Sequence, residues 1–432
     1  MQRKNVLGSI VTGMAVLLVS ACAGKDTQQT NQSLTLCVDE LINAQFKTGF
    51  EEFRTLYPDV ELNVEVASEI LPNSERINTR ILAGEGPDLL LMASYGNSDV
   101  YKMMSAQAFA PLDEFMETDS TWKAEDYVEP VLDAGVYEGR QMIMPLSYTV
   151  RVALTTQENL EKAGISLEAC RDMASFLNEM KKFAGAEGME RLFLEPGRLI
   201  AFPEYASHEF LNYKDGKLGI DAETLRQTCE AYKGFYAEDT GQEPVSDTSW
   251  DGYGEMVAKG EAGMCIPISN MNFWAAAQNM SAQAHPLLWP FLNDQGETTA
   301  TIMHYAGIRA NSENRQNAWN MLKILMGDTV QAEMADKGSY SPVLKKELQD
   351  FMDEAEQTAF LQGGADMGAA KIPQDIRRQY QEVLMNPGNS IFETNICIAE
   401  FRLAMEPFYE GTASYDACMK EFEKFIRIYL TE

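Results

Sequence analysis

The side chains that could bind a small molecule follow short apolar runs, where the strands of an α/β sheet would end. Open α/β sheets bind ligands at the carboxyl ends of their strands. This rule selects Asp39 and Glu40 after LTLCV, Ser94 and Tyr95 after PDLLLM, and Asn270 and Trp274 after GMCIPIS. The loop residue Tyr340 and two residues close after MIMPLS, Tyr148 and Arg151, complete the set. Aromatic faces can stack on a sugar ring, and carboxylates and amides can form hydrogen bonds with its hydroxyl groups. We therefore expect a site for a small polar ligand.

Each of these residues also has a purely structural interpretation. Trp274 could pack inside the protein, as we expect of Trp289 and Trp319. Asp39 and Glu40 could stabilise the N-terminus of a following helix through their charge. The sequence alone leaves both interpretations open.

Motifs of catalysis are absent from the sequence. It contains neither G-x-S-x-G nor H-E-x-x-H, the signatures of a serine nucleophile and of a zinc protease. Its three histidines, His208, His285 and His304, are far apart, so we interpret each as structural. Two carboxylates that cleave a glycoside remain possible, because their separation is spatial and cannot be read from a sequence. We expect no metal and no cofactor.

The N-terminus combines a basic start with an apolar segment. Arg3 and Lys4 precede the uncharged segment 6–19, and VSAC follows at 19–22. A membrane-spanning helix needs about 20 apolar residues, so this shorter segment fits a secretory signal peptide, residues 1–21. VSAC resembles a bacterial lipobox, which implies cleavage before Cys22 and attachment of lipid, such as palmitate, to its thiol. An ordinary signal peptide with an incidental cysteine is the alternative.

The polar residues 22–33 then read as a flexible, lipidated tether. It would hold an exported protein on the outer face of the cell membrane, on the extracellular or periplasmic side.

Composition predicts a globular body of two or more domains that does not bind nucleic acid. The chain has 432 residues, of which 45% are hydrophobic, and its formal charge is −30. A domain usually has about 100–200 residues, and phosphate binding needs a basic surface. Six cysteines besides Cys22 are scattered without a CxxC pair, which leaves disulfides open. Cys37 and Cys265 lie in apolar runs and are predicted to be buried.

Strand and helix patterns alternate at the start of the body. Alternating apolar residues predict strands at 34–38 and 60–66, and spacings of three and four predict a helix between them. A second helix and the buried run GPDLLLMAS follow, so the order is that of an α/β layer with a mainly parallel sheet. Further on we expect a strand at 137–148, a mostly helical segment at 157–260 with a hairpin at 212–221, strands at 260–269 and 300–310, and a helix around 318–325.

Several stretches, in this order, resemble the extracellular solute-binding proteins of ATP-driven importers, the large family that includes the maltose-binding protein. The resemblance covers most of residues 34–432. It rests on FEEFRTLYPDVELNVE (50–65), RILAGEGPDLLLM (80–92), APLDEF (110–115), YEGRQMIMPLS (137–147), AKGEAGMCIPISNMNFW (258–274), HYAGIRANSENRQNAWNMLKILM (304–326) and GSYSPV (338–343). RVALTTQENL (151–160) and ASYGNSDVY (93–101) depart from the family's pattern.

The resemblance implies a periplasmic-binding-protein-like fold of two α/β lobes joined by crossing strands, which close on a ligand in the cleft between them. It implies a first lobe of 34–148 plus 301–342 and a second lobe of 149–300 plus 343–432.

It further implies that Trp274 stacks on a sugar. The protein would be the monomeric, non-enzymatic component of an ABC importer that delivers a sugar or oligosaccharide to a membrane permease. A binding protein for a peptide, a polyamine or a metal chelate is the alternative, as is a surface enzyme acting on glycans.

Overall fold

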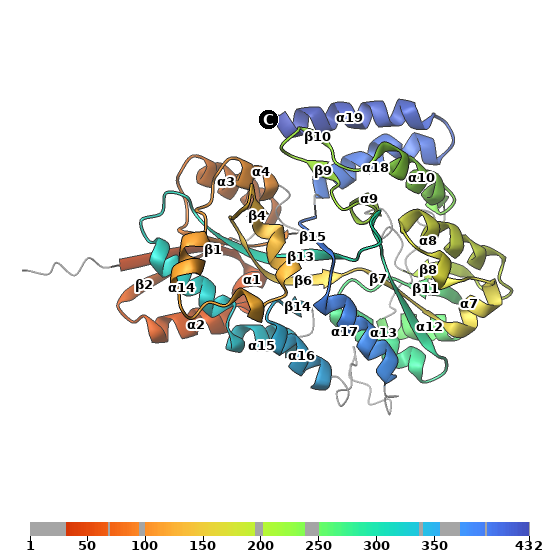
Figure 1. Ribbon diagram of the computed structural model, residues 1–432, viewed down its shortest axis with the longest axis horizontal. Coiled ribbons are helices and arrows are strands. Elements are labelled where there is room, and N and C mark those ends of the chain that lie inside the picture. Colours follow the sequence, from red (N-terminus) through yellow and green to blue (C-terminus); the bar gives the residue numbers. More distant parts are fainter. Residues whose placement is uncertain are drawn as a thin grey trace, which may run out of the picture.

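Two β-sheets, each flanked by helices, lie side by side in the computed structural model (Figure 1). The first sheet has the strand order β14-β6-β13-β3-β1-β2 with β15 paired to β13, and the second has the order β12-β7-β11-β8. The structure describes residues 32–67, 70–94, 100–194, 202–237, 250–336, 340–354, 372–393 and 395–431.

The strands of the two sheets are short and mostly buried. The first sheet contains β1 (Gln32–Asp39), β2 (Val60–Ala67), β3 (Leu89–Ala93), β6 (Met144–Val150), β13 (Thr299–Ile308), β14 (Ser341–Pro342) and β15 (Asn389–Ile391). The second contains β7 (Val152–Thr156), β8 (Arg191–Leu194), β11 (Ala262–Cys265) and β12 (Pro286–Pro290). Two small hairpins are formed by β4 (Val136–Tyr137) with β5 (Arg140–Gln141) and by β9 (Leu211–Asn212) with β10 (Lys217–Leu218).

Helices surround both sheets (Figure 1). In chain order they are α1 (Glu40–Gln45), α2 (Lys47–Leu56), α3 (Ile70–Leu82), α4 (Val100–Ser105), α5 (Asp113–Thr118), α6 (Glu129–Leu132), α7 (Gln157–Ala163), α8 (Met173–Met180), α9 (Phe202–Tyr205), α10 (Ala222–Lys233), α12 (Trp250–Ala258), α13 (Asn270–Ser281), α14 (Arg315–Leu325), α15 (Asp328–Asp336), α16 (Lys345–Glu354), α17 (Gln374–Met385), α18 (Asn395–Tyr409) and α19 (Tyr415–Thr431). Side-chain caps start several of them, and the N-cap Ser269 of α13 accepts a hydrogen bond from the backbone N–H of Asn272.

The parallel part of the first sheet has the predicted strand–helix alternation. Strands β2, β1 and β3 are parallel, whereas β13 runs antiparallel to both β3 and β6. The predicted hairpin is also confirmed as β9 and β10, with Gly216 at a φ of 63°, a value that glycine adopts without strain. The short strands β7, β8 and β12 were not predicted, because they lack a clear alternation of apolar and polar residues.

The chain passes from the first sheet to the second at a single residue. Strand β6 ends at Val150 and β7 begins at Val152, so Arg151 lies at the crossing. Buried aromatic residues fill the space beside it. The ring of Tyr380 stacks on Phe273 with centroids 3.7 Å apart, and the Tyr148 hydroxyl donates to the Leu384 carbonyl at 2.6 Å. The predicted lobe boundaries remain a prediction.

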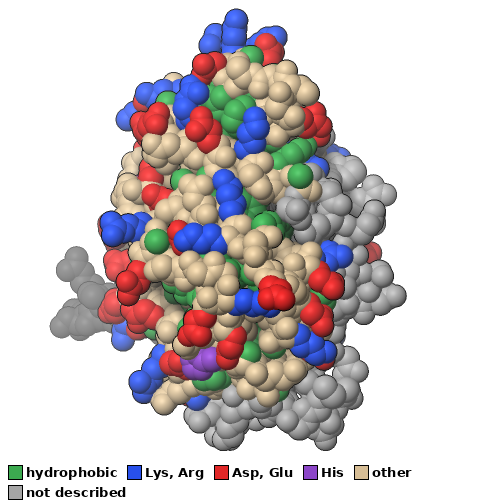
Figure 2. Space-filling view, turned by 90° about the vertical axis from the view of Figure 1, so that its right-hand side faces the viewer, with side chains coloured by type: hydrophobic (Ala, Val, Ile, Leu, Met, Phe, Trp, Pro, Cys, Tyr) green, Lys and Arg blue, Asp and Glu red, His purple; other side chains and the backbone are tan. Residues whose placement is uncertain are grey.

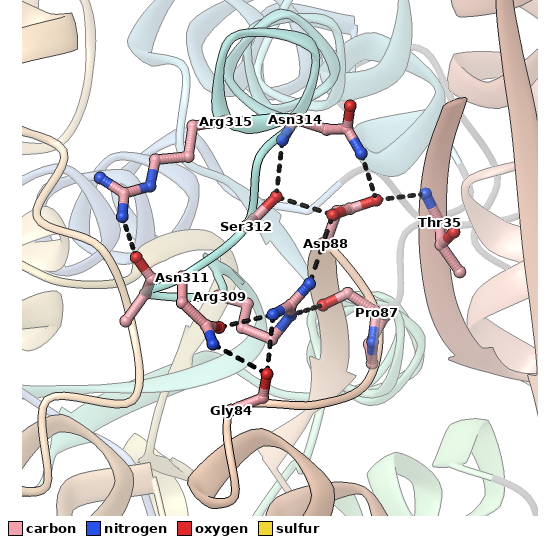
Figure 3. Close-up of polar contacts among 10 residues, drawn as sticks. Thr35, Gly84, Pro87, Asp88, Arg309, Asn311, Ser312, Asn314 and Arg315 are labelled. Carbon is pink, nitrogen blue, oxygen red and sulfur yellow. Dashed lines mark hydrogen bonds and ion pairs between the residues drawn. The ribbon is translucent and has the colours of Figure 1, made fainter. Parts of the chain in front are cut away.

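A polar network joins the start of β3 to the turn after β13 (Figure 3). The buried Asp88 carboxylate accepts hydrogen bonds from the Thr35 backbone N–H at 3.0 Å, the Ser312 hydroxyl at 2.7 Å and the Asn314 side-chain amide at 3.2 Å. The Arg309 guanidinium lies 3.6 Å from the same carboxylate and donates to the Pro87 carbonyl. These contacts join GEGPD to IRANSEN, two stretches on which the family resemblance rests.

The six cysteines in the described part of the chain are buried. They include Cys37 and Cys265, so the prediction that these two are buried is confirmed. The predicted signal peptide, Cys22 and almost all of the tether lie outside the described residues. Within the described residues, no helix has both the length and the apolar composition that a membrane crossing requires.

The face that carries α7 and α8, at the right of Figure 1, has a mixed surface. Acidic, basic and hydrophobic side chains are interspersed on it (Figure 2). This face is therefore not uniformly acidic, although the chain as a whole carries a formal charge of −30.

Close contact between α12 and α13 predicts the effect of one substitution. A Cβ atom on Gly254 of α12 would lie 2.3 Å from the Ala276 carbonyl oxygen of α13, so the two backbones would have to separate. We expect Gly254→Ala to lower the free energy of unfolding by about 1–3 kcal/mol. Urea denaturation measures this loss. As a control, Gly185→Ala places its Cβ in open space, and an equal loss in both variants would contradict the prediction.

Candidate ligand-binding cleft

The crossing strands bring predicted ligand residues together around the middle of β13. The Ser94 hydroxyl donates to the Ile302 carbonyl, and Ile302 pairs with Tyr148 on β6. Arg151 follows directly after Val150, which pairs with Ala300. Ser94 and Ile302, which are more than 200 positions apart in the sequence, therefore meet at β13.

Two more predicted residues reach the same place from other elements. Asn270, the first residue of α13, donates from its side-chain amide to the Ser341 hydroxyl at 2.9 Å and accepts from the Tyr380 hydroxyl at 2.9 Å. Ser341 pairs with Tyr148, and Tyr340 precedes it. The residues brought together are thus Ser94, Tyr148, Arg151, Asn270 and Tyr340.

Arg151 is the centre of a cluster that links four segments of the chain. Its guanidinium lies 3.2 Å from the Glu393 carboxylate and donates to the Tyr205 hydroxyl at 3.2 Å. The Tyr205 hydroxyl also donates to Glu393 at 2.8 Å and lies 3.1 Å from the Thr301 hydroxyl. Burial lowers the pKa of Arg151, but the charge interactions and hydrogen bonds with Tyr205 and Glu393 raise it by more. The pKa of Arg151 is therefore raised overall. Arg151 therefore stays charged, and Glu393 balances that charge.

His304 lies in the same region, although it was not among the ligand residues selected from the sequence. Its side chain is fully buried, and its Nδ1 lies 2.7 Å from the Ser147 hydroxyl. The rings of Phe46 and Tyr340 each pack against it in an edge geometry, 5.5 Å away between centroids. Burial lowers the pKa of the imidazole to about 3, so it is neutral near pH 7.

Of the other predicted ligand residues, Trp274 packs next to this group on α13, Glu40 lies at the start of α1, and the remaining two are not fully described. Trp274 is 0% exposed, and its ring packs edge-on against Phe273 and Tyr380 at 4.9 and 5.3 Å. Glu40 begins α1 with an exposed side chain. Tyr95 and the side chain of Asp39 lie outside the described residues. No contact with a ligand is tested for any of these residues, so their roles remain predictions.

A cavity of about 600 Å³ opens between the two sheet-containing halves of the molecule. Its lining includes Tyr101, Tyr137, Glu204, Glu209, Tyr213 and Phe392. The rings of Tyr101 on α4 and Tyr213 after β9, both in its lining, stack on each other with centroids 4.9 Å apart. These lining residues were not among those selected from the sequence. Tyr213 flanks the predicted Asp215-Gly216 turn and Tyr137 opens the YEG turn, so aromatic residues beside turns were the signal that could have found them.

The cavity and the Arg151 cluster share two segments of backbone. Glu204 lines the cavity and the next residue, Tyr205, belongs to the cluster. Phe392 lines the cavity, donates its backbone N–H to the Tyr101 hydroxyl at 3.1 Å, and precedes Glu393 of the cluster. A ligand in the cavity would therefore sit beside the crossing strands, with groups from both halves around it.

Comparison with known proteins identifies the family. A family model described as bacterial extracellular solute-binding protein matches residues 50–360. The chain belongs to this family. As a member of this family of extracellular solute-binding proteins, the chain is an exported binding protein rather than an enzyme.

The solute-binding protein has relatives of known name and of known structure. A binding protein of Brucella abortus (strain 2308) is 24% identical over 340 residues, covering 73% of this chain and 78% of that protein. The sugar-binding protein MalE of Xanthomonas citri matches with a TM-score of 0.64 at 14% identity, over 93% of this chain and 98% of that one. The cyclic alpha-maltosyl-1,6-maltose binding protein of Arthrobacter globiformis matches with a TM-score of 0.61 at 14% identity, over 92% and 98%. These likenesses confirm the periplasmic-binding-protein-like fold.

Proposed function

We propose that this solute-binding protein captures a sugar or oligosaccharide in the cleft between its two lobes and delivers it to a membrane permease. The observation that carries this proposal is the cavity of about 600 Å³, whose walls combine tyrosine rings with carboxylates. Cavities of about 300–1,000 Å³ are typical of small-molecule sites. The lobes are those implied by the resemblance, 34–148 plus 301–342 and 149–300 plus 343–432.

The cavity chemistry suits a carbohydrate. Tyr137 and Tyr213 offer ring faces for the apolar side of a sugar, and Glu204 and Glu209 can accept hydrogen bonds from its hydroxyl groups. MalE of Xanthomonas citri and the Arthrobacter globiformis protein are named as binders of sugars, which supports the same ligand class for this chain.

We also propose that the protein acts as a lipid-anchored monomer. After cleavage before Cys22, lipid on the Cys22 thiol and the polar tether that follows would hold the folded body near the permease. Two acyl chains give stable anchoring, whereas one gives only marginal binding. Growth of cells with labelled palmitate should label the protein, and Cys22→Ser should abolish the label; a label that persists would contradict the anchor.

A thermal-shift screen tests the ligand class. The protein lacking residues 1–22 is heated with mono- and oligosaccharides, peptides and polyamines. A ligand at 100 times its dissociation constant should stabilise the folded state by about 2.7 kcal/mol. We expect carbohydrates to raise the melting temperature; a response to polyamines or peptides alone would contradict a sugar ligand, since the carboxylates of the cavity also suit a cation.

A matched pair of tyrosine variants tests the place of binding. We expect Tyr213→Ala to weaken binding of the responding carbohydrate about tenfold or more, because stacking of one ring contributes about 0.5–1.5 kcal/mol beyond the buried area. Tyr57→Ala is the control, since Tyr57 is also partly exposed and has one aromatic neighbour, Phe53, at 5.0 Å. Titration calorimetry compares the two, and equal dissociation constants would place the ligand elsewhere.

A further inference from the structure

We propose that the Nε2 atom of His304 contacts the ligand and selects uncharged, hydroxyl-bearing molecules. This inference rests on the proposed function, because it concerns a ligand held beside the crossing strands. His304 does not itself line the cavity of about 600 Å³, so the inference extends the site toward β13. It assigns a role to a histidine that the sequence analysis had interpreted as structural.

A β-bulge places His304 on the polar face of the crossing strands. Thr301 pairs with Thr149 and Ile302 with Tyr148, but the next pair is His304 with Ser147. Met303 is thus an extra residue on β13, and the following pair, Tyr305 with Pro145, leaves out Leu146 of β6 and restores the register. Paired residues share a face of the sheet, so the bulge puts His304 on the face of Ser147, where regular alternation would have put Met303. Bulges re-aim side chains in this way next to functional sites.

The imidazole has one buried nitrogen without a protein partner. Nδ1 lies 2.7 Å from the Ser147 hydroxyl, whereas Nε2 is buried and has no hydrogen-bond partner within the part of the chain that the structure describes. About 90% or more of buried polar groups have a partner, so each exception calls for an explanation. Of the two aromatic rings packed against the imidazole, Phe46 is fully buried, whereas Tyr340 is partly exposed. A ligand would reach Nε2 from the side of Tyr340.

The hydrogen-bonding capacity of Nε2 favours a hydroxyl group. The Ser147 hydroxyl can donate to Nδ1 or accept from it, so Nε2 is a donor in one tautomer and an acceptor in the other. A hydroxyl group can donate and accept, and therefore fits both tautomers. A carboxylate only accepts and an ammonium group only donates, so each of these fits one tautomer alone.

The charges around the crossing favour an uncharged ligand. The imidazole is neutral because its pKa is about 3. The nearby Arg151 guanidinium is balanced by the Glu393 carboxylate at 3.2 Å. The Nη1 atom of Arg151 is buried without a hydrogen-bond partner among the described residues, but the charge of the guanidinium is compensated. An acidic ligand would thus find no uncompensated cation among the described groups of this cluster.

Two substitutions of His304 separate ligand contact from a purely structural role. His304→Asn keeps a polar atom near the position of Nδ1, so it retains the Ser147 contact but loses Nε2. His304→Gln extends its amide to the position of Nε2. Binding is measured by titration calorimetry with glucose, galactose and maltotriose, and with glucuronate and galacturonate as acidic counterparts. Near-ultraviolet circular dichroism establishes that both variants are folded.

We expect a neutral sugar to bind the unmodified protein and its acidic counterpart to bind at least about tenfold more weakly. We expect His304→Asn to weaken neutral-sugar binding about tenfold, the equivalent of one hydrogen bond. We expect the dissociation constant of His304→Gln to stay within about threefold of that of the unmodified protein. The inference would be overturned by a larger loss of affinity in His304→Gln than in His304→Asn, by no loss in either variant, or by equal affinity for neutral and acidic sugars. The proposed function would stand in each of these cases. Absence of binding by every sugar would instead overturn the proposed function, and this inference with it.

Discussion

Replacing Trp274 with alanine should lower the free energy of unfolding by about 3–5 kcal/mol, the usual loss for a large aromatic residue in a core. The side chain is 0% exposed and packs edge-on against Phe273 and Tyr380. Its removal would leave a cavity beside the crossing strands, because α13 and α17 cannot both move inward without separating from the sheets. Urea denaturation followed by circular dichroism measures the change.

Trp274→Phe is the matched control for this experiment. It keeps an aromatic ring in the same space, so we expect a clearly smaller loss than for alanine. The opposite result would be a Trp274→Ala variant that unfolds at the same urea concentration as the unmodified protein and yet no longer binds the sugar. That outcome would contradict the packing role and would support the sequence-based prediction that Trp274 stacks on the ligand.

Replacing Asp88 with alanine should cost about 3–5 kcal/mol, the loss typical when one partner of a buried ion pair is removed. The substitution would leave the Arg309 guanidinium without its carboxylate and would remove the acceptor for Thr35, Ser312 and Asn314 (Figure 3). The network holds β1, β3 and the turn after β13 together, so its loss should destabilise the whole first sheet.

Two controls accompany the Asp88 variant. Asp88→Asn keeps an oxygen acceptor without the charge, and we expect its loss to lie between those of alanine and the unmodified protein. Glu117→Ala removes an exposed carboxylate from α5, and exposed substitutions usually change stability by less than about 0.5 kcal/mol. Equal denaturation midpoints for Asp88→Ala and Glu117→Ala would show that the network contributes nothing to stability.

The fold could be predicted from the sequence wherever a strong apolar pattern met a clear boundary. The run LLLMA follows a Gly-Pro turn and is uninterrupted, which is why β3 was predicted as a buried strand. The alternation in VELNVEVA likewise predicted β2. Strand β8 could not be found in this way, because RLFL has only four residues and its pairing with β11 depends on a segment some 70 positions later.

The site could be predicted only in part, for a different reason. The rule that ligands bind at strand ends selected Ser94 and Asn270, and these meet Arg151, which was selected as a crossing residue, beside β13. The rule could not foresee that Asn270 would be held between Ser341 and Tyr380, since those contacts form between separate elements. Nor could it select His304, because a bulge is set by the pairing of two strands and leaves no mark in the local pattern.

The central claim is that a carbohydrate binds between the two sheet-containing halves and leaves unaltered. A crystal structure of the protein, grown with the sugar that gives the largest thermal shift, tests the place and the chemistry of binding together. We predict one intact sugar in the cleft beside the crossing strands, in contact with residues of both halves. A sugar bound on the outer surface of one half, or a cleaved sugar in the cleft, would contradict the account.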